Sequence, residues 1–199
     1  MHISEGILSG EMLAAGWAGS IAGISYGLKK TDTSKIVQTA LISSAFFLAS
    51  LVNVRIGPSS THLSLLAPMG LILGEAVFPA VFVALLLQAV LFQFGGLVVL
   101  GANTFAMATP ALLVYFVFGR SIRESSGKIR VSVLSFMAGF AAVMIAAGIS
   151  GAFLGLTDRN FLGAIKILAA AHVPVAIIEG IVTAFLITWL KKSSFSFYR

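Results

Sequence analysis

The sequence predicts an all-α membrane protein, a polytopic bundle of about seven transmembrane helices. Hydrophobic residues make up 58% of the 199 residues and charged residues only 10%, whereas soluble domains carry about a quarter charged residues. The mean hydropathy is +1.03. The apolar residues also form runs long enough to cross about 30 Å of hydrocarbon as helices. We therefore expect one transmembrane domain covering residues 1–199, without internal repeats or linkers.

The apolar runs define the expected helices in chain order. They are Gly6–Leu28, Ile36–Asn53, a short segment from His62 to Gly74, Ala76–Leu100, Asn103–Phe118, Val131–Leu156 and Phe161–Leu190. The third run is shorter than a usual crossing, so we expect it to be short, tilted or sheltered by its neighbours. Val54–Thr61 is a polar break between the second and third runs, and residues 158–160 form a polar turn.

Two stripes of small residues recur every fourth position, and such stripes allow two helices to approach closely. The residues are Gly19, Gly23 and Gly27 in the first run, and Ala138, Ala142 and Ala146 in the sixth. Both an internal packing face and a contact face for a partner subunit fit this pattern.

The basic residues predict the orientation of the bundle in the cell membrane. If the N-terminus lies outside, three Lys or Arg follow the first run, four follow the fifth, and three close the chain, all on the cytoplasmic side. The outer side then keeps only Arg55, Arg159 and Lys166. Because basic residues favour the cytoplasmic side, we expect a multi-pass protein with its N-terminus outside and its C-terminus in the cytoplasm.

Several classes of site are excluded by composition. The chain has no cysteine, which excludes disulfides and thiolate metal sites. The formal charge of +6 does not indicate nucleic-acid binding, because the basic residues fall in short loops between apolar runs. No Gly-x-x-x-x-Gly-Lys-Ser/Thr motif is present, so we expect no ATP site on this chain.

The first two residues form a candidate metal chelate. The amine and the amide of Met1-His2 close a five-membered ring on an ion, and that amide with the His2 Nδ1 closes a six-membered ring. The three nitrogens lie in one plane, an arrangement that suits Ni(II) and Cu(II). No Lys or Arg precedes Lys29, so we expect no signal peptide and a Met1 that stays on the mature protein. The tail would then be tucked into the bundle on the outer side.

His62 is the candidate for the fourth nitrogen, because an ionisable residue beside a membrane span is a functional candidate by default. The alternative is that His62 caps the helix that follows it, a role that Thr61 or Ser60 would serve better. Six polar residues are expected to surround the ligands. They are Glu5, Ser59, Ser60, Thr61, Asn103 and His172.

Three of these six have simpler interpretations as well. Glu5 would hold the tail by pairing with Arg55 or would accept a hydrogen bond near the metal. Asn103 would bond between helices. The His172 ring would satisfy backbone carbonyls freed by Pro174. The sequence leaves both kinds of role open for each residue.

The N-terminal motif Met1-His2-Ile3-Ser4-Glu5-Gly6 resembles the Met-His-Ile-x-Glu-Gly start of the CbiM/NikM family. These proteins are the substrate-binding (S) components of energy-coupling-factor (ECF) importers for cobalt and nickel. Further similar segments are Gly57–His62, Phe94–Leu97, Leu100–Asn103 and His172–Gly180. The resemblance covers nearly the whole chain. It implies that the Met1 amine, the amide and side chain of His2, and His62 hold the metal.

The resemblance also implies the partners. A transmembrane coupling subunit and two ATP-binding cassette ATPases would supply the energy, often with a small additional membrane subunit. The chain itself would then be a transport subunit and not an enzyme. Planar nitrogen ligation favours Ni(II) as the transported ion over Co(II).

Three alternatives stay open at this point. They are cobalt uptake by the same kind of subunit, a self-contained metal channel or carrier, and a membrane haem protein with His62 and His172 as axial ligands. A carrier would more naturally show repeated halves.

Overall fold

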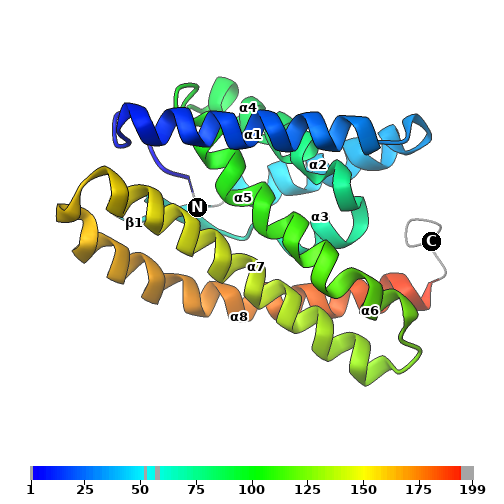
Figure 1. Cartoon of the computed structure of the whole chain (residues 1–199). Coiled ribbons are helices and arrows are strands. Elements are labelled where there is room, and N and C mark those ends of the chain that lie inside the picture. The colour runs from blue at the N-terminus through cyan, green and yellow to red at the C-terminus, as the bar shows by residue number, and fades with distance from the viewer. Residues whose placement is uncertain (1, 52, 57–58, 194–199) are drawn as a thin grey trace.

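The computed structural model describes residues 2–51, 53–56 and 59–193. Its helices are α1 (Gly10–Lys30), α2 (Ile36–Leu51), α3 (Leu66–Leu73), α4 (Val77–Phe92), α5 (Leu100–Val114), α6 (Arg120–Glu124), α7 (Lys128–Thr157) and α8 (Leu162–Lys192). A π-helical turn, Tyr115–Gly119, joins α5 to α6, and short 3₁₀ turns span Thr33–Lys35, Gly74–Ala76 and Arg159–Phe161. Figure 1 shows α1 along one side of the molecule and the α7–α8 hairpin along the other, with α5 between them.

The membrane character of the bundle is supported by the length and composition of its helical stretches. Four stretches in the described residues are long and apolar enough to cross a bilayer. They are Leu66–Phe92, Leu100–Glu124, Lys128–Thr157 and Arg159–Lys192, and Ile36–Leu51 is a shorter apolar helix. The expected short third segment is α3, with eight residues. Its neighbours shelter it, since six of these residues are buried.

The polar break between α2 and α3 is a β-hairpin, so the fold is not purely helical. Strands β1 (Asn53–Ile56) and β2 (Ser59–His62) pair antiparallel, with Asn53 opposite His62. Backbone N–H and C=O groups that are shielded from water need internal partners. The hairpin supplies these partners and leaves His62 at the end of its second strand.

The fourth helix ends earlier than the sequence predicts, at Phe92 instead of Leu100. Gln93, Gly95 and Gly96 all have positive φ angles, of 56°, 77° and 124°, a conformation that ends a helix. Residues 94–99 form a loop, and α5 begins at Leu100 instead of Asn103. This loop is where the N-terminal tail binds.

Both stripes of small residues are packed inside this chain. A Cβ added to Gly23 would lie 2.4 Å from the Phe78 ring, and one added to Gly19 would lie 2.5 Å from the Phe105 ring. The Ala138, Ala142 and Ala146 stripe of α7 is fully buried. The stripes therefore serve packing between helices of the same bundle, and neither presents a free face to a partner.

Candidate metal centre

Two histidines far apart in the sequence meet at the end of the N-terminal tail. The rings of His2 and His62 stack with their centroids 4.9 Å apart and their planes at 29°. Only 5% of His2 and 4% of His62 is exposed. A metal–nitrogen bond is about 2 Å long, so both rings are within reach of one ion. Met1, the other predicted ligand, lies outside the described residues.

Asn103 clamps the tail backbone directly after His2. The Ile3 N–H donates to the Asn103 Oδ1 over 2.8 Å, and the Asn103 Nδ2 donates to the Ile3 carbonyl over 3.0 Å. The Ile3 side chain is fully buried in an apolar cluster that includes Val99, Leu154 and Leu168. Two hydrogen bonds and a buried side chain thus fix the position of the residue next to His2.

Glu5 anchors the tail to the loop between α4 and α5. The Glu5 N–H donates to the Gly95 carbonyl over 2.9 Å, and the Val98 N–H donates to the Glu5 Oε1 over 2.8 Å. A Cβ on Gly96 would lie 2.4 Å from the Glu5 carboxyl carbon. The carboxylate therefore binds loop backbone, and the glycine makes room for it. The side chain of Arg55, its predicted partner, is outside the described part of the chain.

The loop carries a second glycine that lies close to the clamp. A Cβ on Gly95 would lie 2.8 Å from the Asn103 Nδ2 and 3.7 Å from the His2 Nδ1. The φ angle of Gly95 is +77°, which side chains rarely adopt. The Gly-Gly pair is therefore required both for the turn of the loop and for the close approach of the tail.

The hydrogen bonding of His62 determines which of its nitrogens can bind a metal. Its Nδ1 lies 3.1 Å from the Leu63 carbonyl, so the Nδ1–H is the donor and the lone pair is on Nε2. That Nε2 is buried and has no hydrogen-bond partner among the described residues. A buried nitrogen lone pair without a partner is costly, and coordination to a metal would satisfy it.

Both rings are neutral at physiological pH. Burial lowers the pKa of His2 to about 3, and burial also holds the pKa of His62 well below its ordinary value of 6.5. The charged form of an imidazole is disfavoured where water is excluded. Because a metal binds only the neutral ring, burial leaves both side chains ready for coordination.

Glu179 of α8 holds the loop that follows His62, a role that the sequence did not reveal. Its Oε1 accepts from the N–H and the Oγ of Ser64, the latter over 2.9 Å, and from the Leu65 N–H over 2.8 Å. Glu179 is 1% exposed. A carboxylate within an apolar span is rare, and this rarity is the signal in the sequence that marks Glu179.

His172 is fully buried in α8, but its ring does not hydrogen-bond the backbone carbonyl that Pro174 leaves without a donor. The Nδ1 bonds the Leu168 carbonyl over 2.7 Å, whereas the residue four positions before Pro174 is Ala170. In a helix the ring of residue i lies closest to the turn before it, which explains this choice. The Nε2 of His172 has no hydrogen-bond partner among the described residues.

The remaining predicted residues are placed only by their backbone. Ser59, Ser60 and Thr61 belong to β2, and their side chains are outside the described part of the structure. In that described part, no three His, Asp or Glu side chains gather to form a metal site. The side-chain donors that the fold brings together are therefore the imidazoles of His2 and His62.

Comparison with known proteins shows the family of this chain. Residues 2–196 match the family model CbiM, described as the cobalt uptake substrate-specific transmembrane region. A Haemophilus influenzae protein named "Putative metal transport protein" is 39% identical over 96% of this chain and 94% of its own length. The fused nickel transport protein NikMN of Rhodobacter capsulatus is 28% identical over 98% of this chain and 62% of its own length.

A solved structure has the same fold. The crystal structure of a truncated transition metal transporter superposes with a TM-score of 0.83 and 25% identity, over 97% of this chain and 99% of that one. The family match extends over nearly the whole chain, including the tail and the loop that bring His2 and His62 together. The chain therefore belongs to the CbiM family and is the membrane component of a cobalt or nickel transporter.

Proposed function

We propose that this chain is the substrate-binding subunit of an ECF importer and that it captures Ni(II) outside the cell. The observation that carries the proposal is the buried, stacked pair of His2 and His62. The ligands would be the Met1 amine, the His2 amide and Nδ1, and the His62 Nε2. The clamp by Asn103 and the anchor by Glu5 would hold the chelating tail in place.

Nickel is preferred on chemical grounds. Four nitrogens in one plane suit Ni(II), and the Irving–Williams order also places Ni(II) above Co(II). The nickel transport protein of R. capsulatus supports this choice. The family description names cobalt uptake, so Co(II) is the second candidate for the transported ion.

Transport requires that the site both binds and releases. A site that holds the ion equally well in every state of the bundle shifts no equilibrium and moves no ion. We propose that a transmembrane coupling subunit and two ATPase subunits drive this change, with a small additional membrane subunit where the system contains one. The tail and the hairpin loop are the elements whose separation would open the site, since each carries one of the two imidazoles.

The chain with a C-terminal tag is expected to bind one Ni(II) with a weak d–d absorption band typical of planar nitrogen ligation. Isothermal titration with Ni(II) and with Co(II), followed by absorption spectroscopy, measures both properties. Uptake of radioactive nickel by cells that also express the coupling and ATPase subunits tests transport. Tighter binding of Co(II) than of Ni(II) would make cobalt the transported ion.

The proposed topology has seven spans, with the N-terminus outside. Cysteines introduced at Ser126 and Lys192, both exposed beside helix ends, should be labelled only from the cytoplasmic side. A cysteine at the exposed Arg159, in the turn between α7 and α8, should be labelled from outside. The chain has no native cysteine, so each label reports one position. Labelling of position 126 or 192 from outside would contradict the topology.

Replacement of Glu179 by alanine is expected to weaken nickel binding by about 10–100-fold, the usual effect of losing a group that orients a ligand. The Ser64 and Leu65 N–H groups lose their acceptor, and the loop that carries His62 is released. Glu179→Gln should restore most of the affinity, because an amide oxygen can still accept these bonds. Isothermal titration measures the affinity of each variant.

The matched control for this experiment is Thr183→Ala. Thr183 is also buried on α8, one turn after Glu179, and its Oγ1 donates to the backbone carbonyl of that residue. Its loss should lower thermal stability without changing nickel affinity. Unchanged affinity in Glu179→Ala would show that the His62 loop is held by other contacts.

A further inference from the structure

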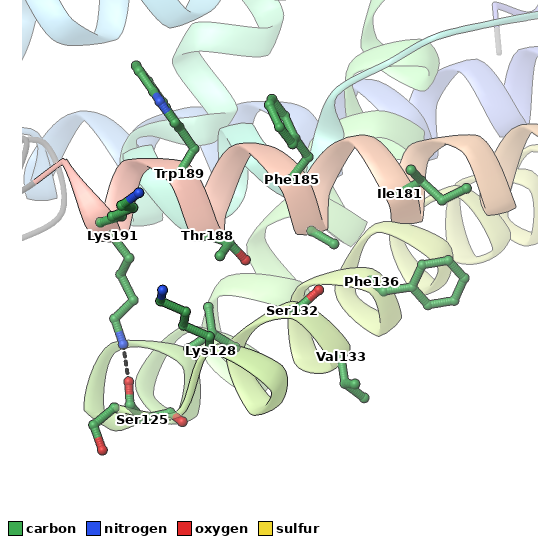
Figure 2. Close-up of a pocket in the computed structure, with 14 residues that line it drawn as sticks. Ser125, Lys128, Ser132, Val133, Phe136, Ile181, Phe185, Thr188, Trp189 and Lys191 are labelled. Carbon is green, nitrogen blue, oxygen red and sulfur yellow. Dashed lines mark hydrogen bonds between the residues drawn. The ribbon is translucent and has the colours of Figure 1, made fainter.

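A second feature of the molecule lies far from the candidate metal centre, where α7 begins and α8 ends. A cavity of about 950 Å³ opens there between the first turns of α7 and the last three turns of α8. Its lining on the α7 side is Ser125, Ser126, Lys128, Val131, Ser132, Val133 and Phe136. Figure 2 shows Ser125 and Lys128 at one end of this cavity and Ile181 at the other. The hydroxyls of Ser132 and Thr188 lie between the two helices.

The mouth of the cavity is basic. Lys128 is the first residue of α7 and Lys192 is the last residue of α8, and both are exposed. The third lysine, Lys191, is already engaged, because its Nζ donates to the carbonyls of Ile122 and Ser125. None of the described residues that line the cavity is acidic. An anionic group at this mouth would therefore meet two amines without a competing carboxylate.

Apart from the hydroxyls of Ser132 and Thr188, the rest of the cavity wall is apolar, and it follows α8 toward the middle of the bundle. Trp189, Phe185 and Ile181 are spaced about one turn apart and are 52%, 75% and 58% exposed. At a rise of 1.5 Å per residue, Ile181 lies about 16 Å along the helix from Lys192. This length is about half the thickness of the hydrocarbon core. The cavity thus has a charged end and an apolar wall whose length matches the thickness of one leaflet.

We propose that this cavity binds an anionic phospholipid of the surrounding membrane. The phosphate would lie against Lys128 and Lys192, with the hydroxyls of Ser125 and Ser126 as additional donors. One acyl chain would follow Phe185 and Ile181 along α8. Basic pockets between membrane helices recognise anionic headgroups in this way. A phospholipid matches both the charge of the mouth and the polarity change along the cavity, which an apolar partner helix does not.

The test uses Trp189 as a reporter within the site. The full-length protein is reconstituted in phosphatidylcholine vesicles that contain increasing fractions of either brominated phosphatidylglycerol or brominated phosphatidylcholine. The Trp189 signal is the difference between the wild type and W189F, since the chain contains only two tryptophans. We expect brominated phosphatidylglycerol to quench Trp189 with an apparent association constant about tenfold higher than that of brominated phosphatidylcholine.

The double variant K128Q/K192Q should lose this headgroup preference. The matched control is K29Q/K30Q, which removes two exposed lysines at the end of α1 and should retain it. Equal quenching by the two lipids would overturn the proposal, as would a preference that survives in K128Q/K192Q. If both lipids quench Trp189 equally and this quenching disappears when the coupling subunit is added, the cavity is a protein interface. That result would also overturn the proposal.

Discussion

One extra residue ahead of Met1 is expected to abolish tight nickel binding while the protein still folds and inserts. The extension converts the terminal amine into an ordinary amide, which is a far poorer donor. It also adds bulk next to a histidine that is only 5% exposed. Loss of a group that hydrogen-bonds a metal ligand typically lowers metal affinity by about 10–100-fold. Loss of one of the four nitrogen donors should lower nickel affinity by at least as much. Isothermal titration with Ni(II) measures the loss.

Two controls separate the amine from the added bulk. A C-terminal tag leaves the terminus untouched and should leave the affinity unchanged. Acetylation of Met1 removes the amine without adding a residue and should have the same effect as the extension. If the acetylated protein binds nickel as tightly as the native one, the N-terminal chelate is wrong, and His62 with His172 becomes the better site.

His62→Ala is the second change with a large expected effect, a loss of nickel affinity of more than about 100-fold. The Nε2 of His62 is buried and has no hydrogen-bond partner among the described residues. The His62 ring also stacks on that of His2. Without it, water takes the fourth position of the plane. His172→Ala should lower nickel affinity by less, about 10–100-fold at most, because His172 is expected to lie beside the ligands without binding the metal itself. Titration of both variants measures the difference.

A folding control is needed, because both histidines are buried. The thermal unfolding of the metal-free proteins should change by similar amounts in His62→Ala and His172→Ala, since each substitution leaves a cavity of the same size. Only the nickel affinity should then separate the two variants. Equal losses of affinity would mean that His172 is a ligand as much as His62 is.

The sequence by itself predicts the membrane class and the N-terminal half of the proposed chelate. Apolar runs predict helices in lipid because a membrane span must satisfy its backbone within one segment. The amine, the amide and the Nδ1 of Met1-His2 are covalent neighbours, so their chelate rings follow from bonding alone. These inferences need no knowledge of how the chain folds.

Only the tertiary structure decided which distant groups meet. The pairing of His2 with His62, the three hydrogen bonds of Glu179 to the loop after His62, and the binding of Glu5 to the loop before α5 all join residues far apart in the chain. The early end of α4 depends on positive φ angles at Gln93, Gly95 and Gly96. Hydropathy does not report backbone angles or the partners of single polar groups. In an apolar bundle each buried polar group must find a partner, and packing of the whole chain selects which one.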